Sequence, residues 1–276
     1  MPSRQTGSEP SQSPALVTTV HDPDGRLLRF LRRSGKALRD YGAVYAFVTD
    51  LTDGSLIAAL RAAGVNVEVG ATGVPGEGQR RALAAAVEGG YTELFSCDFD
   101  RWLHWHGAYP AELAGLPRRM ALDYATAWYV CLGRTERALA THPAAQVLPE
   151  TQTNRALSTV AGTCLDATAG AAWIRLDAAR LILAGSTAPD KATDLEWPGL
   201  VLSVDPTLVQ GALLEGLEFE TADAYADEIV ALGSRDAWVR ATYDRPPVLR
   251  DRAQLAADSI SALMRVMGKG CPPPTP

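Results

Sequence analysis

Four short apolar runs alternate with three helical segments in the first hundred residues, and this alternation constrains the fold more than any other feature. The predicted strands are residues 15–20, 43–49, 65–69 and 93–97, and the predicted helices are residues 26–38, 55–63 and 79–88. A strand–helix repeat of this kind forms parallel strand pairs joined by right-handed crossovers. The sequence therefore predicts an α/β fold with a mostly parallel, Rossmann-type central sheet and flanking helices.

The pattern loosens beyond residue 105. Strands are expected at residues 127–132, 170–174, 201–204 and 213–219, and helices at residues 109–120, 150–163, 177–184, 221–232 and 250–267. Residues 193–198 are expected to form a polar loop. Residues 1–14 are rich in Ser, Pro and Gln and predict a disordered tail, and residues 268–276 predict a loose, proline-rich end. The G-x-G-x-x-G fingerprint is missing after the first strand, which argues against a dinucleotide oxidoreductase.

The composition excludes several classes of protein. The 276 residues carry a formal charge of −6 without a basic stripe, so no nucleic-acid partner is expected. The four cysteines are scattered without a C-x-x-C motif, which indicates neither a zinc module nor a disulfide framework. No apolar run approaches 18 residues, so we expect no integral membrane segment and a soluble, cytoplasmic protein.

The fourth apolar run ends abruptly in Asp98-Phe99-Asp100. In an extended chain residues two apart point the same way, so both carboxylates are expected at the carboxyl end of the strand, where open α/β sheets bind ligands. Two converging carboxylates suit a divalent cation shared with substrate phosphates. The alternative is a strand that ends in solvated acids.

Arg80 and Arg81 follow a glycine-rich loop at residues 70–78, at a predicted helix start. Helix amino termini and arginines both suit phosphate groups. Two surface arginines on an amphipathic helix are the alternative. Arg101 lies so close to the two acids that an ion pair with them competes with a phosphate role.

The segment Thr-Asp-Leu-Glu-Trp-Pro at residues 193–198 brings two carboxylates together with an aromatic side chain. Asp194 or Glu196 could accept the proton of an acceptor hydroxyl, and the indole of Trp197 could pack on a sugar ring. Asp194 is slightly favoured as the base. The alternative is an acidic turn whose tryptophan fills the core.

Arg134 and His142 belong to a polar cluster after a predicted strand. The cluster could clamp an anionic acceptor or a donor diphosphate, although a solvated helix start explains most of its members. His104 and His106 form an H-x-H pair without an evident third ligand, so structural or exposed histidines are expected there.

Taken together, the segments VTTVHDPDG, GEGQRRAL and CDFD resemble the GT-A fold of nucleotide-sugar glycosyltransferases, nearest to the family-2-like group. The resemblance covers residues 15–101 well and continues more weakly to residue 219. TDLEWP occupies the place of the acceptor-side acidic motif of that family. The Q-x-x-R-W signature and the membrane helices of polysaccharide synthases are absent, so a polymerising membrane enzyme is not expected.

The resemblance implies a metal-dependent glycosyltransferase that moves a sugar from a nucleotide diphosphosugar to an unidentified acceptor. It implies that His21, Asp22, Thr49 and Asp50 hold the nucleotide, and that Asp98 and Asp100 bind Mn²⁺ or Mg²⁺ on the diphosphate. Residues 15–105 would form the nucleotide-binding half, and residues 106–267 the acceptor-side half of the same domain. The resemblance does not settle the donor sugar, the nucleobase of the donor, whether the transfer inverts or retains the anomeric configuration, or the oligomeric state.

Two other interpretations compete with this one. In a haloacid-dehalogenase-like phosphatase, an apolar strand also ends in D-x-D, and the first aspartate is the nucleophile. That motif usually lies near the amino terminus and continues into Gly-Thr, whereas Arg101-Trp102 follow here. The other alternative is a GT-A-like protein that binds a nucleotide or sugar without transferring it.

Overall fold

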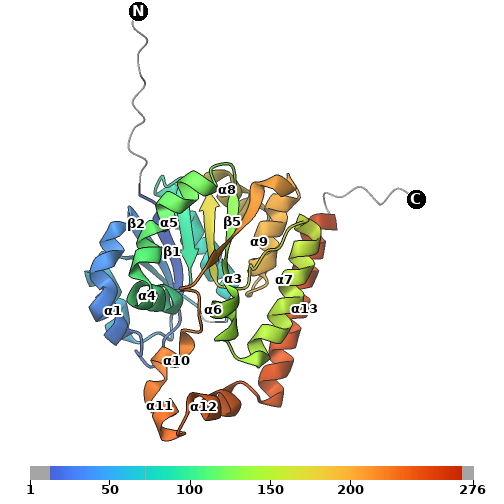
Figure 1. Cartoon of the computed structure of the whole chain (residues 1–276). Coiled ribbons are helices and arrows are strands. Elements are labelled where there is room, and N and C mark those ends of the chain that lie inside the picture. Colours follow the sequence, from blue (N-terminus) through green and yellow to red (C-terminus); the bar gives the residue numbers. More distant parts are fainter. Residues whose placement is uncertain (1–12, 72, 269–276) are drawn as a thin grey trace, which may run out of the picture.

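The structure is a computed structural model that describes residues 13–71 and 73–268 (Figure 1). Residues 1–12 and 269–276, which make up most of the two predicted tails, lie outside the described residues. No helix in the described part of the chain combines the length and apolarity needed to cross a membrane.

A seven-stranded mixed sheet with the order β3-β2-β1-β4-β6-β5-β7 forms the centre of the molecule. The strands are β1 (Ala15–Val20), β2 (Ala43–Thr49), β3 (Asn66–Gly70), β4 (Glu93–Cys97), β5 (Tyr129–Arg134), β6 (Ala171–Arg175) and β7 (Val209–Leu214). The strands β3, β2, β1 and β4 are parallel, as the strand–helix alternation predicts. β6 runs antiparallel to both of its neighbours, whereas β5 and β7 pair in parallel.

Helices cover both faces of this sheet. They are α1 (Leu28–Ser34), α2 (Gly54–Ala62), α3 (Pro75–Glu88), α4 (Phe99–Ala108), α5 (Pro110–Asp123), α6 (Glu136–Ala140), α7 (Ala144–Ala161), α8 (Leu176–Gly185), α9 (Thr193–Leu202), α10 (Thr221–Ala224), α11 (Ala226–Ala231), α12 (Arg235–Thr242) and α13 (Pro246–Gly268), with 3₁₀ turns at Gly35–Asp40 and Pro206–Leu208. α7 and α13 lie side by side at one flank of the molecule (Figure 1).

The strands bury alternate side chains in two separate cores, because successive residues of a strand point to opposite faces. In β1, Leu16 and Val20 belong to the core beneath α1, α2, α4 and α5, whereas Ala15 and Val17 belong to the core beneath α3, α8, α9 and α13. Both faces of the central strands are therefore apolar, which explains why they appear in the sequence as short uninterrupted apolar runs.

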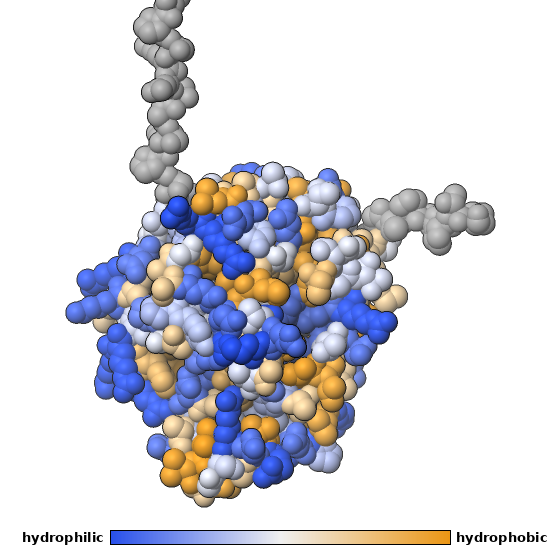
Figure 2. All heavy atoms as spheres, in the orientation of Figure 1, coloured by the Kyte–Doolittle hydropathy of each residue, from blue (hydrophilic) through white to orange (hydrophobic). Residues whose placement is uncertain are grey.

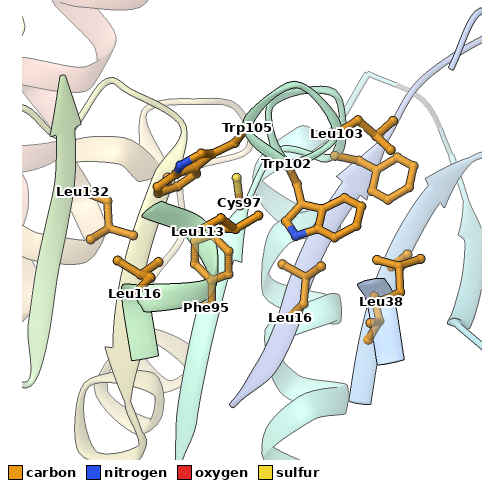
Figure 3. Close-up of a cluster of buried hydrophobic side chains, with 14 of the residues drawn as sticks. Leu16, Leu38, Phe95, Cys97, Trp102, Leu103, Trp105, Leu113, Leu116 and Leu132 are labelled. Carbon is orange, nitrogen blue, oxygen red and sulfur yellow. The ribbon is translucent and has the colours of Figure 1, made fainter. Parts of the chain in front are cut away.

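The aromatic side chains of α4 fix this helix on the sheet (Figure 3). Trp102 and Trp105 are fully buried and pack in the same core as Phe95 of β4. The indole N–H of Trp102 donates to the hydroxyl of Tyr41 at 2.9 Å, and that of Trp105 donates to Glu112 at 2.9 Å. With both indole donors satisfied in the core, the start of α4 is held firmly at the end of β4.

Several predicted elements in the second half of the chain differ from the structure. The helix expected at residues 221–232 is divided into α10 and α11. Residues 201 and 202 end α9 instead of forming a strand, and the last strand is Val209–Leu214 rather than residues 213–219. Residues 193–198, expected as a polar loop, form the first turns of α9. Nearly every side of α9 is buried, so its sequence lacks the one-sided periodicity that reveals a surface helix.

A smaller helical layer, α10–α12, lies beyond the sheet and has its own aromatic cluster of Phe219, Trp238 and Tyr243. Figure 2 shows hydrophobic side chains gathered at the lower end of the molecule, over this layer, whereas most of the same face is mixed or polar. Val230 of α11 is 79% exposed. Residues of α10 line a small cavity together with His21 and Asp22, which follow β1.

Candidate active site

The D-x-D segment lies where β4 passes into α4. β4 ends at Cys97, Asp98 is the N-cap residue of α4, and Asp100 lies in the first helical turn. The prediction that Asp98 and Asp100 extend a strand is therefore wrong, because the chain turns into a helix directly after Cys97. Both carboxylates nevertheless line one cavity at the ends of the parallel strands.

This cavity, here named the strand-end pocket, has a volume of about 410 Å³. It is lined by Thr19, Val20, His21, Leu27, Phe47, Thr49, Ala71, Gly73, Val74, Pro75, Asp98, Phe99, Asp100 and Lys191. Residues from the ends of β1, β2, β3 and β4 thus surround one space, as expected for the carboxyl edge of a parallel sheet. The pocket joins an apolar wall, which includes Phe47, to two carboxylates and an ammonium group.

Two of the four predicted nucleotide-binding residues line the strand-end pocket. His21 Nδ1 and Thr49 Oγ1 are 2.7 Å apart, at hydrogen-bond distance. Asp22 instead accepts backbone N–H groups from Arg26 at 3.0 Å and Leu27 at 2.7 Å, so its carboxylate shapes the turn after β1 and lines a smaller neighbouring cavity. Asp50 is exposed beside the pocket and is not among its lining residues.

The predicted phosphate loop has two parts in the structure. Ala71, Gly73, Val74 and Pro75 line the strand-end pocket, whereas Gly76 and Gly78 serve the packing of α3. α3 begins at Pro75, so Arg80 and Arg81 lie within the helix and not at its start. A Cβ atom on Gly78 would lie 2.5 Å from the Phe47 ring, and one on Gly76 would lie 2.4 Å from the Ala188 carbonyl oxygen. These glycines therefore permit close packing of α3 against the sheet and the loop before α9.

Neither arginine of α3 lines the strand-end pocket. Arg80 donates to the Ala188 carbonyl at 2.6 Å and to Ser186, and so fixes the loop that precedes α9. Arg81 forms an ion pair with Glu68 and lies over the Phe47 ring. The sequence interpretation that gives them to a phosphate thus has no support from their positions.

Asp100 lies among other charged groups at the floor of the strand-end pocket. Burial raises its pKa, and the neighbouring carboxylates of Glu220 and Asp98 raise it further, to about 6, against the opposing effect of Arg101. Arg101 and Glu220 are each only 7% exposed and form an ion pair at 3.1 Å. The partner of Arg101 is therefore Glu220, from a distant part of the sequence, and not the D-x-D carboxylates.

Lys191 lines both pockets beside Asp98, and the sequence analysis did not identify it. Its ammonium group is 2.8 and 2.9 Å from the two carboxylate oxygens of Asp98. Burial lowers its pKa, but the negative charges of Asp98 and Asp194 outweigh that effect and raise it to about 12. A single lysine in an Asp-Lys-Ala run carries no recognisable motif, and only the packing of the loop before α9 brings it to the strand ends.

A second cavity of about 360 Å³, here named the helix-side pocket, adjoins the first at Asp98 and Lys191. It is lined by Asp98, Arg101, Gln146, Pro149, Glu150, Thr153, Thr168, Gly170, Lys191, Asp194, Glu220, Thr221, Arg252, Leu255, Ala256 and Ser259. Most of these residues come from α7, α9 and α13. The two pockets are thus built by different halves of the chain and meet at one ion pair.

Asp194 is the carboxylate of α9 that faces the helix-side pocket. Burial raises its pKa, Asp98 and Glu150 add to the effect, and the balance against Lys191 and Arg101 leaves the pKa at about 7. A carboxyl group of this pKa exchanges a proton readily near neutral pH, which is the property required of a general base.

Glu196 and Trp197 are buried in the core, and neither lines the strand-end pocket or the helix-side pocket. Glu196 is 0% exposed, and it accepts hydrogen bonds from the hydroxyls of Ser186 and Thr187 and from the backbone N–H groups of Thr187 and Ala188. Trp197 is buried and donates to Ser186 at 3.1 Å. In the expected loop, Asp194 and Glu196 could both have faced one cleft. They lie instead in the first turns of α9, and a helix turns residues two apart to different sides.

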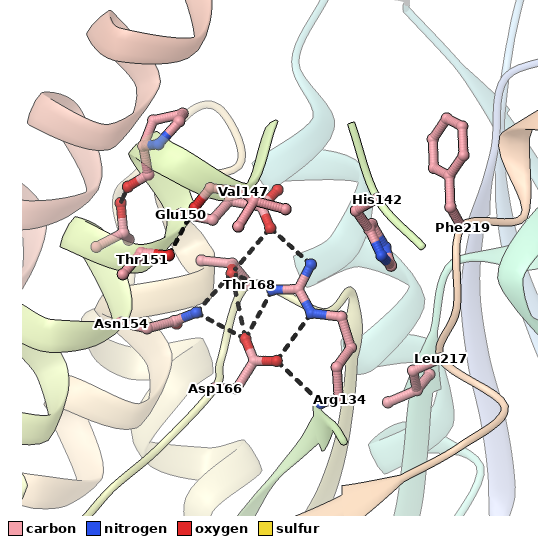
Figure 4. A network of polar contacts seen from close by, with 12 residues as sticks. Arg134, His142, Val147, Glu150, Thr151, Asn154, Asp166, Thr168, Leu217 and Phe219 are labelled. Carbon is pink, nitrogen blue, oxygen red and sulfur yellow. Dashed lines mark hydrogen bonds and ion pairs between the residues drawn. The ribbon is translucent and has the colours of Figure 1, made fainter. Parts of the chain in front are cut away.

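Arg134 lies at the centre of a buried polar network (Figure 4). It donates to Asp166 at 2.8 Å, to Glu150 at 2.7 Å and to Thr168 at 2.9 Å. Its side chain is fully buried, so it supports the wall of the helix-side pocket without reaching the cavity. The predicted role of Arg134 as a direct substrate clamp is therefore not compatible with its position.

His142 is also buried and lies beside Phe219 (Figure 4). Burial and the positive charges of Arg134 and Arg101 lower its pKa to about 3, so the ring is neutral at physiological pH. His104 is on α4, where it contacts Asp223 at 2.6 Å and Glu218 at 3.2 Å. These two ion-pair contacts with residues 218 and 223 fit the structural role that was expected for His104.

The residues of the strand-end pocket fit a divalent cation whose coordination shell would be completed by a bound substrate. Asp98 and Asp100 line the same cavity. Burial is the main cause of the raised pKa of Asp100, and the charges of Glu220 and Asp98 add to it, so a cation bound there would favour the ionised carboxylate. Within residues 13–71 and 73–268, no three His, Cys, Asp or Glu side chains form a ready-made metal cage. Two carboxylates together with substrate phosphates are the usual arrangement for Mg²⁺-type ions.

Comparisons with known proteins identify the fold. No protein-family model and no curated protein matches the sequence. Among solved structures, the glucosyl-3-phosphoglycerate synthase of Mycobacterium tuberculosis in complex with phosphoglyceric acid matches 93% of this chain and 80% of its own, with 14% identity and a TM-score of 0.58. Its complex with UDP matches at 15% identity and a TM-score of 0.56. Its complex with Mn²⁺, UDP-glucose and phosphoglyceric acid matches at 14% identity and a TM-score of 0.56.

These neighbours share the mostly parallel sheet and the flanking helices described above over nearly the whole chain. At 14% identity the likeness shows a shared fold and carries no information about shared substrates. The chain has the GT-A fold of nucleotide-sugar glycosyltransferases.

Proposed function

We propose that the protein is a metal-dependent glycosyltransferase that moves a sugar from a nucleotide diphosphosugar to an acceptor. The observation that carries the proposal is the junction of two pockets at Asp98 and Lys191, with Asp194 facing the second pocket. A transferase needs space for two substrates whose reacting atoms meet, and this arrangement supplies it.

The strand-end pocket is the proposed donor site. His21 and Thr49 lie where the nucleotide would enter, and the apolar wall near Phe47 would pack on the base. Asp98 and Asp100 would hold Mn²⁺ or Mg²⁺, which stabilises negative charge on the diphosphate when it is bound. A metal bound to Asp98 would take over as the cationic partner of that carboxylate, so Lys191 would be free to bind a phosphate oxygen of the donor in the same pocket.

The helix-side pocket is the proposed acceptor site. Asp194 would accept the proton of an acceptor hydroxyl while that oxygen bonds to the anomeric carbon and the bond to the diphosphate breaks. The electron pair of the broken bond leaves with the diphosphate. A transfer in this single displacement inverts the anomeric configuration, so a product that retains the configuration would contradict this role of Asp194.

Donor binding can be tested without knowing the acceptor. Thermal unfolding is measured with nucleoside diphosphates and their sugars, beginning with UDP and UDP-glucose, each with and without Mn²⁺. A ligand at one hundred times its Kd stabilises by about 2.7 kcal/mol, which corresponds to a Tm increase of roughly 5–10 °C for a domain of this size. The absence of any Mn²⁺-dependent stabilisation by the whole panel would contradict the proposal.

Product analysis separates the proposal from its alternatives. A glycosyltransferase releases nucleoside diphosphate and forms a glycoside, a phosphatase releases inorganic phosphate, and a binding protein releases neither. The GT-A fold gives no support to the haloacid-dehalogenase interpretation. The non-catalytic interpretation predicts donor binding of the same strength in the Asp194→Asn variant and no turnover in either protein.

A further inference from the structure

The charges on the wall of the helix-side pocket indicate what kind of molecule it can take. Among the described residues, its cationic side chains are Arg101, Lys191 and Arg252, and its carboxylates are Asp98, Glu150, Asp194 and Glu220. Four acids therefore face three bases, and the wall carries no excess of positive charge. A site for a phosphate or carboxylate group normally presents arginines or lysines that are free to bind it.

Each of the three cations is already paired with a carboxylate of the same wall. Arg101 lies 3.1 Å from Glu220, and Lys191 lies 2.8 Å from Asp98. Arg252 lies 3.7 Å from Glu150, which also accepts a hydrogen bond from the buried Arg134. An anionic ligand would have to displace one of these carboxylates and leave a partly buried acid without its partner, which is costly.

The remaining polar groups of the wall suit hydroxyl groups. Within the described residues, the side-chain amide of Gln146 forms no hydrogen bond, although the residue is 8% exposed and lines the cavity. Arg101 Nε and Glu220 Oε2 are also buried without a hydrogen-bond partner among the described residues. A hydroxyl both donates and accepts, so it can satisfy an amide or an N–H and carboxylate pair, whereas a fully ionised phosphate or carboxylate group only accepts.

We infer that the helix-side pocket binds an uncharged polyhydroxylated acceptor, a sugar or polyol, and not a phosphorylated or carboxylic acid. This inference rests on the proposed function, because it names the acceptor class of the same site. It also separates this chain from the structural neighbours, whose complexes contain phosphoglyceric acid. The side chains of Pro149, Leu255 and Ala256 give the pocket an apolar wall for the C–H groups of such a ligand.

The inference is tested by binding of matched neutral and phosphorylated probes to the full chain. NMR titrations at pH 8 compare glucose with glucose 6-phosphate, and glycerol with phosphoglyceric acid. The neutral member of each pair is expected to bind about tenfold more tightly, because the phosphate group meets like charges and no free cation. Equal or tighter binding of the phosphorylated members, or no binding of glucose or glycerol at millimolar concentration, would overturn the inference.

A pair of variants locates the binding in the pocket. Gln146→Leu removes an amide that faces the cavity and is expected to weaken glucose binding about tenfold. Gln254→Leu makes the same change at an exposed position of α13, outside the pocket lining, and is expected to have no effect. Equal affinity of both variants for glucose would place the binding elsewhere. Donor binding to the strand-end pocket is measured separately, so failure of the proposed function and failure of this inference remain distinguishable.

Discussion

Replacement of Asp194 by Asn gives the sharpest test of the proposed chemistry. The substitution keeps the shape of the side chain and removes its ability to take a proton. General-base assistance is typically worth about 10²–10⁴-fold in rate. Turnover is therefore expected to fall at least about a hundredfold, while the affinity for the nucleotide donor stays nearly unchanged because Asp194 does not line the strand-end pocket.

The pH dependence follows from the position of Asp194. With a pKa of about 7, its basic form makes up roughly 10% at pH 6 and roughly 90% at pH 8, so the wild-type rate should rise about tenfold over this interval. The Asn variant should lose this rise. Released nucleoside diphosphate is measured in steady state between pH 5.5 and 9. An unchanged pH profile in the Asn variant would show that another group titrates.

Stability supplies a second readout for the same substitution. The pKa of Asp194 in the folded protein lies above its ordinary value of 3.8, so its contribution to stability is present below about pH 4 and is lost as the pH rises through about 7. The loss is at most about 4 kcal/mol, at 1.36 kcal/mol per pH unit. Urea unfolding at pH 5 and pH 8 should show a smaller decrease for the Asn variant than for the wild type. Asp177→Asn, at an exposed carboxylate of α8, is the matched control and should change neither readout.

Three further substitutions separate the other roles. Glu196→Gln should lower the free energy of unfolding by about 3 kcal/mol, because an amide N–H₂ would face the donors that now bind the carboxylate; a variant as stable as the wild type in urea would contradict this structural role. Asp100→Ala should abolish the tightening of nucleoside diphosphate binding by Mn²⁺ in calorimetry, and equal affinity in chelator and in Mn²⁺ for the wild type would refute the metal site. Lys191→Met should weaken nucleoside diphosphate binding roughly tenfold without metal, since it removes the ammonium group that lines the donor pocket; unchanged affinity would leave Lys191 as a structural partner of Asp98 alone.

The first half of the fold could be predicted because its information is local. Buried parallel strands need short apolar runs, and the crossovers between them need helices, so residues 15–97 show both patterns plainly. The same argument gathers Thr49, Asp98 and Asp100 at one edge, because the carboxyl ends of parallel strands always meet there. D-x-D could be located from the sequence even though its local conformation is a helix start and not an extended strand.

The second half of the site depended on contacts that no local pattern reveals. Asp194 and Glu196 have the same chemistry and are two residues apart, yet one faces a pocket and the other is fully buried beneath hydrogen bonds from Ser186, Thr187 and Ala188. The difference arises because α9 is surrounded by other elements on nearly every side. The sequence therefore predicts a pocket carboxylate in this segment, but the orientation of α9 determines that it is Asp194.

What the sequence determined by itself is the strand–helix alternation, the sheet edge at which a ligand is expected and the pair of acids at that edge. The tertiary structure decided which charges meet across the chain. Lys191 reaches Asp98 over 93 residues of sequence, and Arg101 reaches Glu220 over 119. Apolar runs and turn residues act over a few neighbouring positions, so strands and helices can be predicted from the sequence. An ion pair depends on where two distant segments pack, so it cannot be predicted from neighbouring residues.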